Sequence, residues 1–153
     1  MIELNQVSKR FQVAGKVIDA LHPTDLTIPG GEVFGLLGFS GAGKSTLLRL
    51  INRLEEPSSG SVRVEGREMT GLTGTELRQA RQRIGMIFQQ FNLLSHRTAL
   101  GNVEFALEVA GLPPAERRAK ARDALSAVGL SDREESYPAQ LSGGQRQRVA
   151  IAR

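Results

Sequence analysis

Nine consecutive residues, Gly38-Phe39-Ser40-Gly41-Ala42-Gly43-Lys44-Ser45-Thr46, have the composition of a loop that binds phosphate. The glycines let the backbone curl until successive N–H groups point at phosphate oxygens. A helix that begins near Lys44 adds the positive end of its dipole at the same place. Lys44 is then placed to reach the terminal phosphates of a nucleotide, and the Ser45 hydroxyl to bind Mg²⁺. The alternative is a glycine-rich turn that merely joins a strand to a helix.

The segments on either side of this loop favour phosphate binding. Residues 33–37 form an apolar run bounded by glycines, which predicts a buried strand. Residues 47–51 predict the start of a helix that runs to about Leu54. Strand, glycine-rich loop, Lys-Ser and helix is the order that a phosphate-binding loop requires.

A second motif, Leu141-Ser142-Gly143-Gly144-Gln145, stands before an amphipathic run over residues 146–153. Ser142 is expected to cap that helix, while Gly143 and Gly144 leave its N–H groups open to an anion. The motif follows Lys44 by about a hundred residues. If two copies pair head to tail about a two-fold axis, each motif closes over the phosphate loop of the other copy. The alternative is an ordinary helix cap with a flexible Gly-Gly pair.

Two further side chains are candidates for a nucleotide site. Phe11 lies at the end of a predicted strand over residues 2–11, where its ring can stack on a purine. The alternative is a core phenylalanine. Gln89 follows a predicted buried strand over residues 84–88, and ligands of open α/β sheets sit beyond such strand ends. Its amide can reach Mg²⁺ or an attacking water, although a solvated Gln-Gln pair is the alternative.

The remaining pattern predicts a mixed α/β chain. Further short strands over residues 17–21, 25–28 and 61–65 suggest an antiparallel layer beside the phosphate loop. Helices are predicted from a Thr75 cap to about Arg83, and over residues 100–110 and 114–128. We interpret the basic run of the last helix as a solvated face, with lipid headgroups or RNA as alternatives; its members are Arg117, Arg118, Lys120 and Arg122. His22 and His96 are interpreted as a turn and a loop residue.

Composition narrows the class of protein. The 153 residues are 40% hydrophobic and carry a net charge of +4, which suits an anionic ligand or an anionic membrane surface. This charge is too small to argue for nucleic acid. With no cysteine, disulfides and thiolate metal sites are excluded. No signal peptide is visible, and no stretch approaches the ~20 apolar residues of a membrane helix, so a role at a membrane would depend on partners.

In this order along the whole chain, the motifs resemble the nucleotide-binding subunit of ABC transporters. The resemblance implies an α/β P-loop NTPase core with an antiparallel β subdomain and an α-helical subdomain. It implies a β subdomain and P-loop core over residues 1–88, a Q-loop and helical subdomain over 89–140, and a signature with the start of its helix over 141–153. The implied cofactors are ATP and Mg²⁺.

The family's functional residues carry over position by position. Gly38 to Thr46 match the Walker A loop, with Lys44 as a catalytic residue and Ser45 as a magnesium ligand. Gln89 matches the Q-loop glutamine, which serves both catalysis and the metal, and Phe11 matches the aromatic that stacks on adenine. The signature that contacts ATP on the opposite subunit is matched by Ser142, Gly143, Gly144 and Gln145.

A narrower resemblance is to the ATPases of methionine importers, carried by residues 38–47, 51–55, 85–98 and 136–138. It implies ATP-driven uptake of methionine, with polar amino-acid importers as the alternative. Implied partners are a second copy in a head-to-tail dimer, membrane permease subunits and a substrate-binding protein, without nucleic acid. The implied location is peripheral, on the cytoplasmic face of the membrane. Two other interpretations are a soluble ABC-type ATPase acting on ribosomes or DNA, and a non-hydrolysing nucleotide-binding regulator.

The sequence departs from the family after the signature. In the family, several further segments follow the signature, and none is found in the 153 residues. They are the strand with the magnesium-ordering Asp, the adjacent catalytic Glu, the D-loop, the switch His and the regulatory domain of the methionine importers. We therefore expect a fragment of a longer reading frame that binds nucleotide weakly and is inactive as an ATPase alone. The predicted strand over residues 33–37 would also require neighbouring strands to pair with its backbone N–H and C=O groups.

Overall fold

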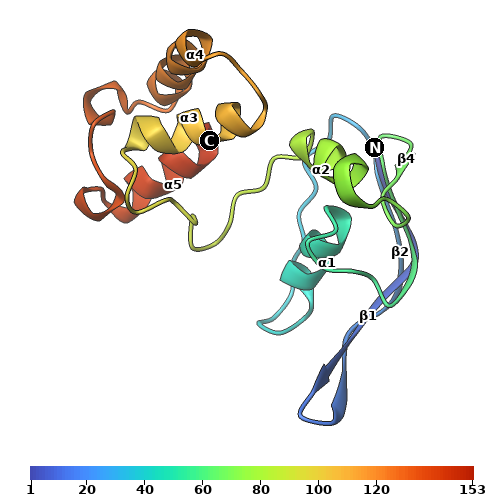
Figure 1. Ribbon diagram of the computed structural model, residues 1–153. Helices are drawn as coiled ribbons and strands as arrows, with labels where there is room; N and C mark the ends of the chain where they lie inside the picture. The colour runs from blue at the N-terminus through green and yellow to red at the C-terminus, as the bar shows by residue number, and fades with distance from the viewer. The chain divides into compact units, whose positions relative to one another are not determined.

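The computed structural model describes residues 1–153, which form two compact units, residues 1–84 and residues 85–153 (Figure 1). Each unit has a hydrophobic core of its own. The first unit contains β1 Ile2–Val13, β2 Lys16–Ile28, α1 Lys44–Ile51, β3 Ser59–Val64, β4 Arg67–Glu68 and α2 Gly74–Gln82. The second contains α3 Ala99–Val109, α4 Pro114–Ala127, α5 Gly143–Ala152 and the short 3₁₀ helices η1 Ser131–Arg133 and η2 Pro138–Gln140.

The sheet of the first unit is antiparallel throughout, in the order β2-β1-β3-β4. The two strands predicted over residues 17–21 and 25–28 are one continuous strand, β2. The prediction split them at His22 and Pro23, which lie within β2 where the register shifts between the Lys9–Leu21 and Val7–Thr24 pairs. An irregularity of this kind accommodates a proline, because its missing N–H is not needed in the ladder. His22 is therefore a strand residue, and its prediction as a turn residue was wrong.

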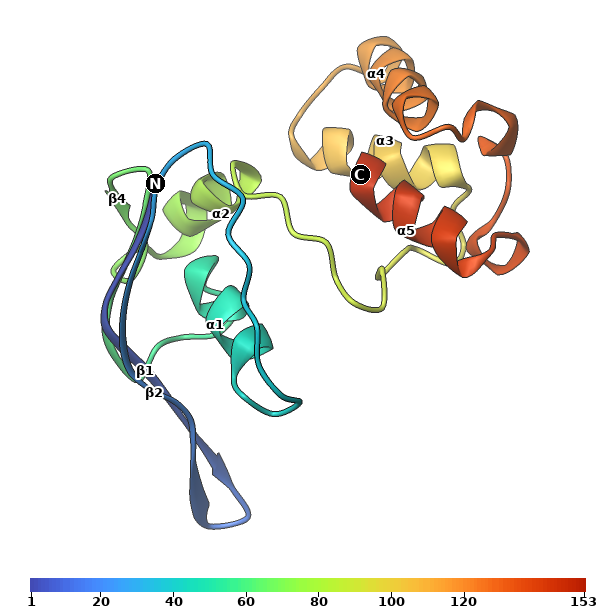
Figure 2. The ribbon, with the colours of Figure 1, turned by 180° about the vertical axis from the view of Figure 1, so that it is seen from behind.

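Both helices of the first unit lie on the same face of this sheet, as the two opposite views show (Figures 1 and 2). Apolar side chains from the strands and from α1 form the core between the sheet and the helices, with Val7, Leu50 and Val62 fully buried. Helix α1 ends at Ile51, short of the predicted Leu54, and Arg81 of α2 donates from Nε to the carbonyl oxygen of Asn52 just beyond it (3.0 Å). The N-cap of α2 is Thr73 rather than the predicted Thr75.

Two predicted buried strands, over residues 33–37 and 84–88, are not strands in the structure. Val33 and Leu37 are almost wholly exposed, at 104% and 95%, and Ile87 is 55% exposed. A parallel strand is held by backbone hydrogen bonds to neighbours on both sides. In the structure no strand pairs with either segment. The prediction of strands from apolar runs bounded by turn residues was therefore wrong here, because neither segment has a neighbouring strand.

The second unit is a small bundle of α3, α4 and α5, with Val103, Leu125 and Val149 in its core. Thr98 caps α3 by accepting from the Gly101 N–H (3.1 Å), close to the predicted helix start. Gly129, with φ +68°, follows the end of α4. None of the helices is both long and apolar enough to cross a bilayer.

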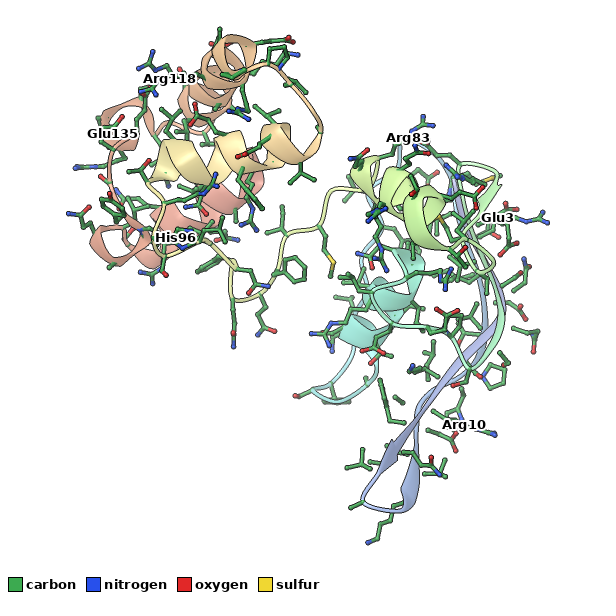
Figure 3. The ribbon with its side chains drawn as sticks, viewed as in Figure 1. Glu3, Arg10, Arg83, His96, Arg118 and Glu135 are labelled. Atoms are coloured by element: carbon green, nitrogen blue, oxygen red, sulfur yellow. The ribbon has the colours of Figure 1, made fainter.

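The basic run of α4 is compensated by acidic neighbours within the same unit. Arg118 lies 3.9 Å from Glu135, and both side chains are on the surface (Figure 3). The other pairs are Arg117 with Glu108 at 4.0 Å, Lys120 with Glu116 at 2.7 Å and Arg122 with Glu134 at 3.0 Å. Paired surface charges attract anionic partners weakly. The arrangement supports the interpretation as a solvated helix face.

Candidate nucleotide-binding site

Helix α1 begins directly from the glycine-rich loop. Its N-cap is Gly43, in the left-handed conformation at φ +82°, and the first helical hydrogen bond runs from the Leu47 N–H to the Gly43 carbonyl oxygen (2.8 Å). The N–H groups of Lys44, Ser45 and Thr46 precede that bond and have no acceptor within the helix. They point out of the helix start together with its positive dipole end, which is an arrangement that binds phosphate.

Gly43 also fixes the loop against the sheet. A β-carbon placed at Gly43 would lie 2.6 Å from the carbonyl oxygen of Ala20 in β2, which no side chain tolerates. At Gly41, by contrast, a β-carbon would meet nothing within 4 Å, although its φ of +83° favours glycine. The loop is therefore anchored on β2 at one end and open at its middle.

Lys44 reaches back across the loop. Its Nζ donates to the carbonyl oxygens of Gly38 and Phe39, both at 2.7 Å. The ammonium group thus lies on the same loop as the N–H groups of Lys44, Ser45 and Thr46, whereas the Ala42 N–H already donates to the Phe39 carbonyl oxygen (3.2 Å). Phe39 is 93% exposed and leaves the loop accessible. An ammonium and several N–H donors converging on one loop fit the phosphates of a nucleotide.

The chain offers Mg²⁺ few ligands of its own. Ser45 is exposed on the first turn of α1. No group of three or more His, Cys, Asp or Glu side chains in residues 1–153 is arranged to hold a metal ion. Magnesium in phosphate sites takes one or two protein ligands and completes its shell with phosphate oxygens and water. The residues fit a magnesium ion that arrives with a nucleotide.

Phe11 lies near the tip of the β1–β2 hairpin, opposite Ile18, and is half-buried. It is not a member of the core of the first unit, so the alternative of a core phenylalanine does not describe it. Its partner strand carries Ala20, the residue against which Gly43 is packed. β2 thereby brings the aromatic ring and the phosphate loop to the same part of the unit.

Gln89 is exposed in a turn at the start of the second unit. The residues that follow, Phe91 and Asn92, are left-handed at φ +61° and +48°. Arg153, just after α5, donates to both of their carbonyl oxygens, at 3.2 Å and 2.7 Å. Burial lowers the pKa of Arg153, which remains a cation at neutral pH. The turn after Gln89 is therefore fastened to the end of α5.

The signature motif forms a capping box at the start of α5. Ser142 Oγ accepts from the Gln145 N–H (3.2 Å), and Gln145 Oε1 accepts from the Ser142 N–H (2.8 Å). A β-carbon at Gly143 or Gly144 would meet nothing within 4 Å, so the helix start is open to a ligand. The capping role of Ser142 was predicted from the sequence, whereas that of Gln145 was not.

The sequence prediction missed two side chains with specific contacts, one in each unit. Lys9 lies over the ring of Phe11, with Nζ 4.8 Å from the ring centre. Asn102 of α3 is fully buried and binds the backbone of the loop before its helix. An amide four positions after the Thr98 cap, among apolar residues, was the available signal for Asn102. For Lys9, the signal was its position two residues before Phe11 on a predicted strand, which places both side chains on one face.

The glycine-rich loop, Lys44 and the helix that follows match a P-loop, although the segment before the loop is not a strand here. A model of the ABC transporter family matches residues 21–153, and the chain belongs to that family. Over its full length it is 58% identical to the methionine import ATP-binding protein MetN of Xanthomonas euvesicatoria and 56% identical to MetN of Geobacillus kaustophilus. The chain spans only 46% and 45% of these two proteins.

Solved structures agree with the fold. The ATP-binding cassette MJ0796, in a dimeric post-hydrolysis state bound to ADP and Pi, matches 99% of this chain with a TM-score of 0.93 and 39% identity. A second dimeric structure of MJ0796, described as a bacterial ABC transporter cassette, matches with a TM-score of 0.93 and 40% identity. The chain covers 68% of that cassette in both cases. The predicted family and fold class are confirmed, while the subdomain boundaries and the roles of the site residues stay predictions.

Proposed function

We propose that this chain is the nucleotide-binding part of an ATP-driven importer of methionine. The family match and the names of the MetN relatives support the class of transporter and its cargo. The open glycine-rich loop at the start of α1 supports ATP as the ligand. The proposed protein couples ATP binding and hydrolysis to uptake across the cytoplasmic membrane, from a peripheral position on its cytoplasmic face.

In this proposal the loop from Gly38 to Thr46 binds the phosphates through its N–H groups. Lys44 leaves the carbonyl oxygens that it now contacts and pairs with the terminal phosphates instead. Ser45 and Gln89 are ligands of Mg²⁺, which when bound neutralises charge on the phosphate oxygens. Phe11 stacks on the adenine ring.

A second copy completes the proposed site. Both solved structures of the MJ0796 cassette are dimers, which supports a pair of ATPase chains. In a head-to-tail pair, Ser142, Gly143, Gly144 and Gln145 of one copy contact the ATP held by the loop of the other. Permease subunits and a substrate-binding protein complete the proposed importer. The charge pairs along α4 are the reason that nucleic acid is not among the proposed partners.

The observation that carries this proposal is the position of Lys44, whose ammonium lies across the phosphate loop 2.7 Å from two of its carbonyl oxygens. Lys44→Ala is therefore expected to weaken ATP binding by about 100-fold or more, because a charge-assisted contact to phosphate contributes roughly 3 kcal/mol. Isothermal titration of the purified chain with Mg-ATP measures this change.

Arg49 provides the control, since it is a cation on the same helix, in its last turn rather than at the loop. Arg49→Ala is expected to leave ATP affinity close to that of the unmodified chain. Equal affinities for the unmodified chain and Lys44→Ala would contradict the proposed function.

A further inference from the structure

The side chain of Lys9 lies against the ring of Phe11, two residues further along β1. Alternate residues of a strand project from the same face, so the two side chains are neighbours. Lys9 Nζ is 4.8 Å from the centre of the ring, within the distance of a cation–π contact. Only 12% of the Lys9 side chain is exposed, so this ammonium group is largely shielded from water.

Lys9 is fixed in this position by the segment that follows α1. Its Nζ donates to the carbonyl oxygen of Glu56 (2.7 Å) and lies 3.2 Å from Glu55 Oε2. The neighbouring backbone is fastened to the same segment, because the Ser58 N–H donates to the Ser8 carbonyl oxygen (2.8 Å). The cation over the ring is thus held by partners from outside the hairpin.

The contact leaves Phe11 with one face occupied. A ring that is covered on one side by a fixed cation, and that stays half-buried rather than packed in the core, can stack only through its other face. The cation–π attraction also restricts the tilt of the ring. The ring is near the phosphate loop, because β2 carries both its partner Ile18 and Ala20, the contact of Gly43.

We propose that Lys9 is a positioning residue for adenine recognition: it fixes the Phe11 ring so that the face opposite Lys9 stacks on the base of the nucleotide. This inference rests on the proposed binding of ATP at the loop from Gly38 to Thr46. Lys9 itself touches neither the base nor the phosphates in this arrangement. The contribution of Lys9 to ligand affinity therefore depends on the presence of a base in the ligand.

The experiment therefore compares a ligand that has a base with one that has none. Affinities of the full chain for Mg-ATP and for inorganic tripolyphosphate, which has no base, are measured by calorimetry. Lys9→Met keeps the apolar stem and removes the charge, and is expected to weaken ATP binding about 3- to 10-fold, the range of a shielded cation–π contact. Tripolyphosphate binding should not change. Lys9→Arg keeps the charge and should restore most of the ATP affinity.

The matched control is Arg10, the adjacent cation of the same strand. Arg10, which Figure 3 labels, has a side chain that is 68% exposed and pairs with Asp19 at 2.8 Å. Arg10→Met should leave both affinities unchanged. In a Phe11→Ala background, Lys9→Met should have no further effect on ATP, because the two residues act as one unit.

The outcomes separate this inference from the proposed function. If Phe11→Ala weakens ATP binding but Lys9→Met does not, the positioning role is overturned and the proposed function stands. If Lys9→Met weakens ATP and tripolyphosphate equally, Lys9 has a structural role and the inference is also overturned. If Phe11→Ala leaves ATP affinity unchanged, base stacking and the role of Lys9 both fail, while phosphate binding stands. If the unmodified chain binds neither ligand, the proposed function fails and the inference fails with it.

Discussion

Asn102 holds the loop before α3 in place with a single buried amide. Its Oδ1 accepts from the Leu94 N–H (2.7 Å). The two N–H groups of its Nδ2 are shared among three carbonyl oxygens, those of Leu94 and Arg97 at 3.1 Å and that of Thr98 at 2.9 Å. Buried polar groups are costly unless paired, and here one side chain satisfies several backbone groups at once. Asn102 therefore holds the loop before α3 through hydrogen bonds to its backbone.

Asn102→Leu, which keeps the volume and removes the amide, is therefore expected to lower the free energy of unfolding by about 2–4 kcal/mol, because it leaves buried backbone groups without partners. Urea titration followed by circular dichroism measures the change. Asn5→Leu, at an exposed position of β1, serves as the control and should change stability little. A loss below about 1 kcal/mol for Asn102→Leu would show that the loop finds other partners.

At the residue scale, the contact predicted from the sequence was a local one, and contacts between distant segments were missed. Ser142 as a cap was predictable, because its partner Gln145 is three positions away. Lys9 contacts residues 46 and 47 positions further along, Glu55 and Glu56, and only the folded chain brings them together. The residues around Lys9 in the sequence give no sign of its contacts with Glu55 and Glu56.

At the scale of elements, the helices of the second unit were predicted within one or two residues at most ends, since caps, prolines and glycines act locally. The strands over residues 33–37 and 84–88 were predicted wrongly from equally clear apolar runs. A helix satisfies its backbone within itself, whereas a strand depends on neighbours that its own residues do not specify. The β1–β2 hairpin was predictable because its two strands lie close in sequence, whereas the pairing of β1 with β3 joins segments that are far apart.

The capping box of α5 leads to a prediction at this scale. Ser142→Ala removes the acceptor of the Gln145 N–H and should destabilise the second unit by about 1 kcal/mol. Hydrogen exchange should show the loss of protection concentrated in the first turn of α5. Ser126→Ala, an exposed serine late in α4, should leave exchange unchanged. Equal protection of α5 in Ser142→Ala and the unmodified chain would show that the cap contributes nothing.

At the scale of the whole molecule, each unit carries one of the two motifs that the sequence singles out. The phosphate loop belongs to the first unit and the signature to the second, and each unit has a separate core. The proposed site needs both motifs, although from different copies. The cargo is a property of the whole importer, and neither motif contacts it in the proposed mechanism.

The proposed cargo is tested in living cells. Disruption of the gene that encodes this chain is expected to abolish most high-affinity uptake of radiolabelled methionine, because no other step of the proposed mechanism supplies the free energy. The unmodified gene should restore uptake, and a gene carrying Lys44→Ala should not. Uptake of a polar amino acid such as histidine is the control and should be unaffected. Loss of histidine uptake with normal methionine uptake would assign the importer to polar amino acids instead.

The apolar stretch over residues 33–37 packs Leu36 against the core of the first unit but leaves its other large side chains exposed. Its backbone lies outside every ladder of the sheet, and Val33 and Leu37 project almost fully into solvent. An uncharged segment with unpaired backbone is a template on which the same segment of another molecule can add as a strand. Concentrated samples of these 153 residues should therefore form cross-β aggregates nucleated at this stretch, and a charged side chain in place of Val33 should slow their growth.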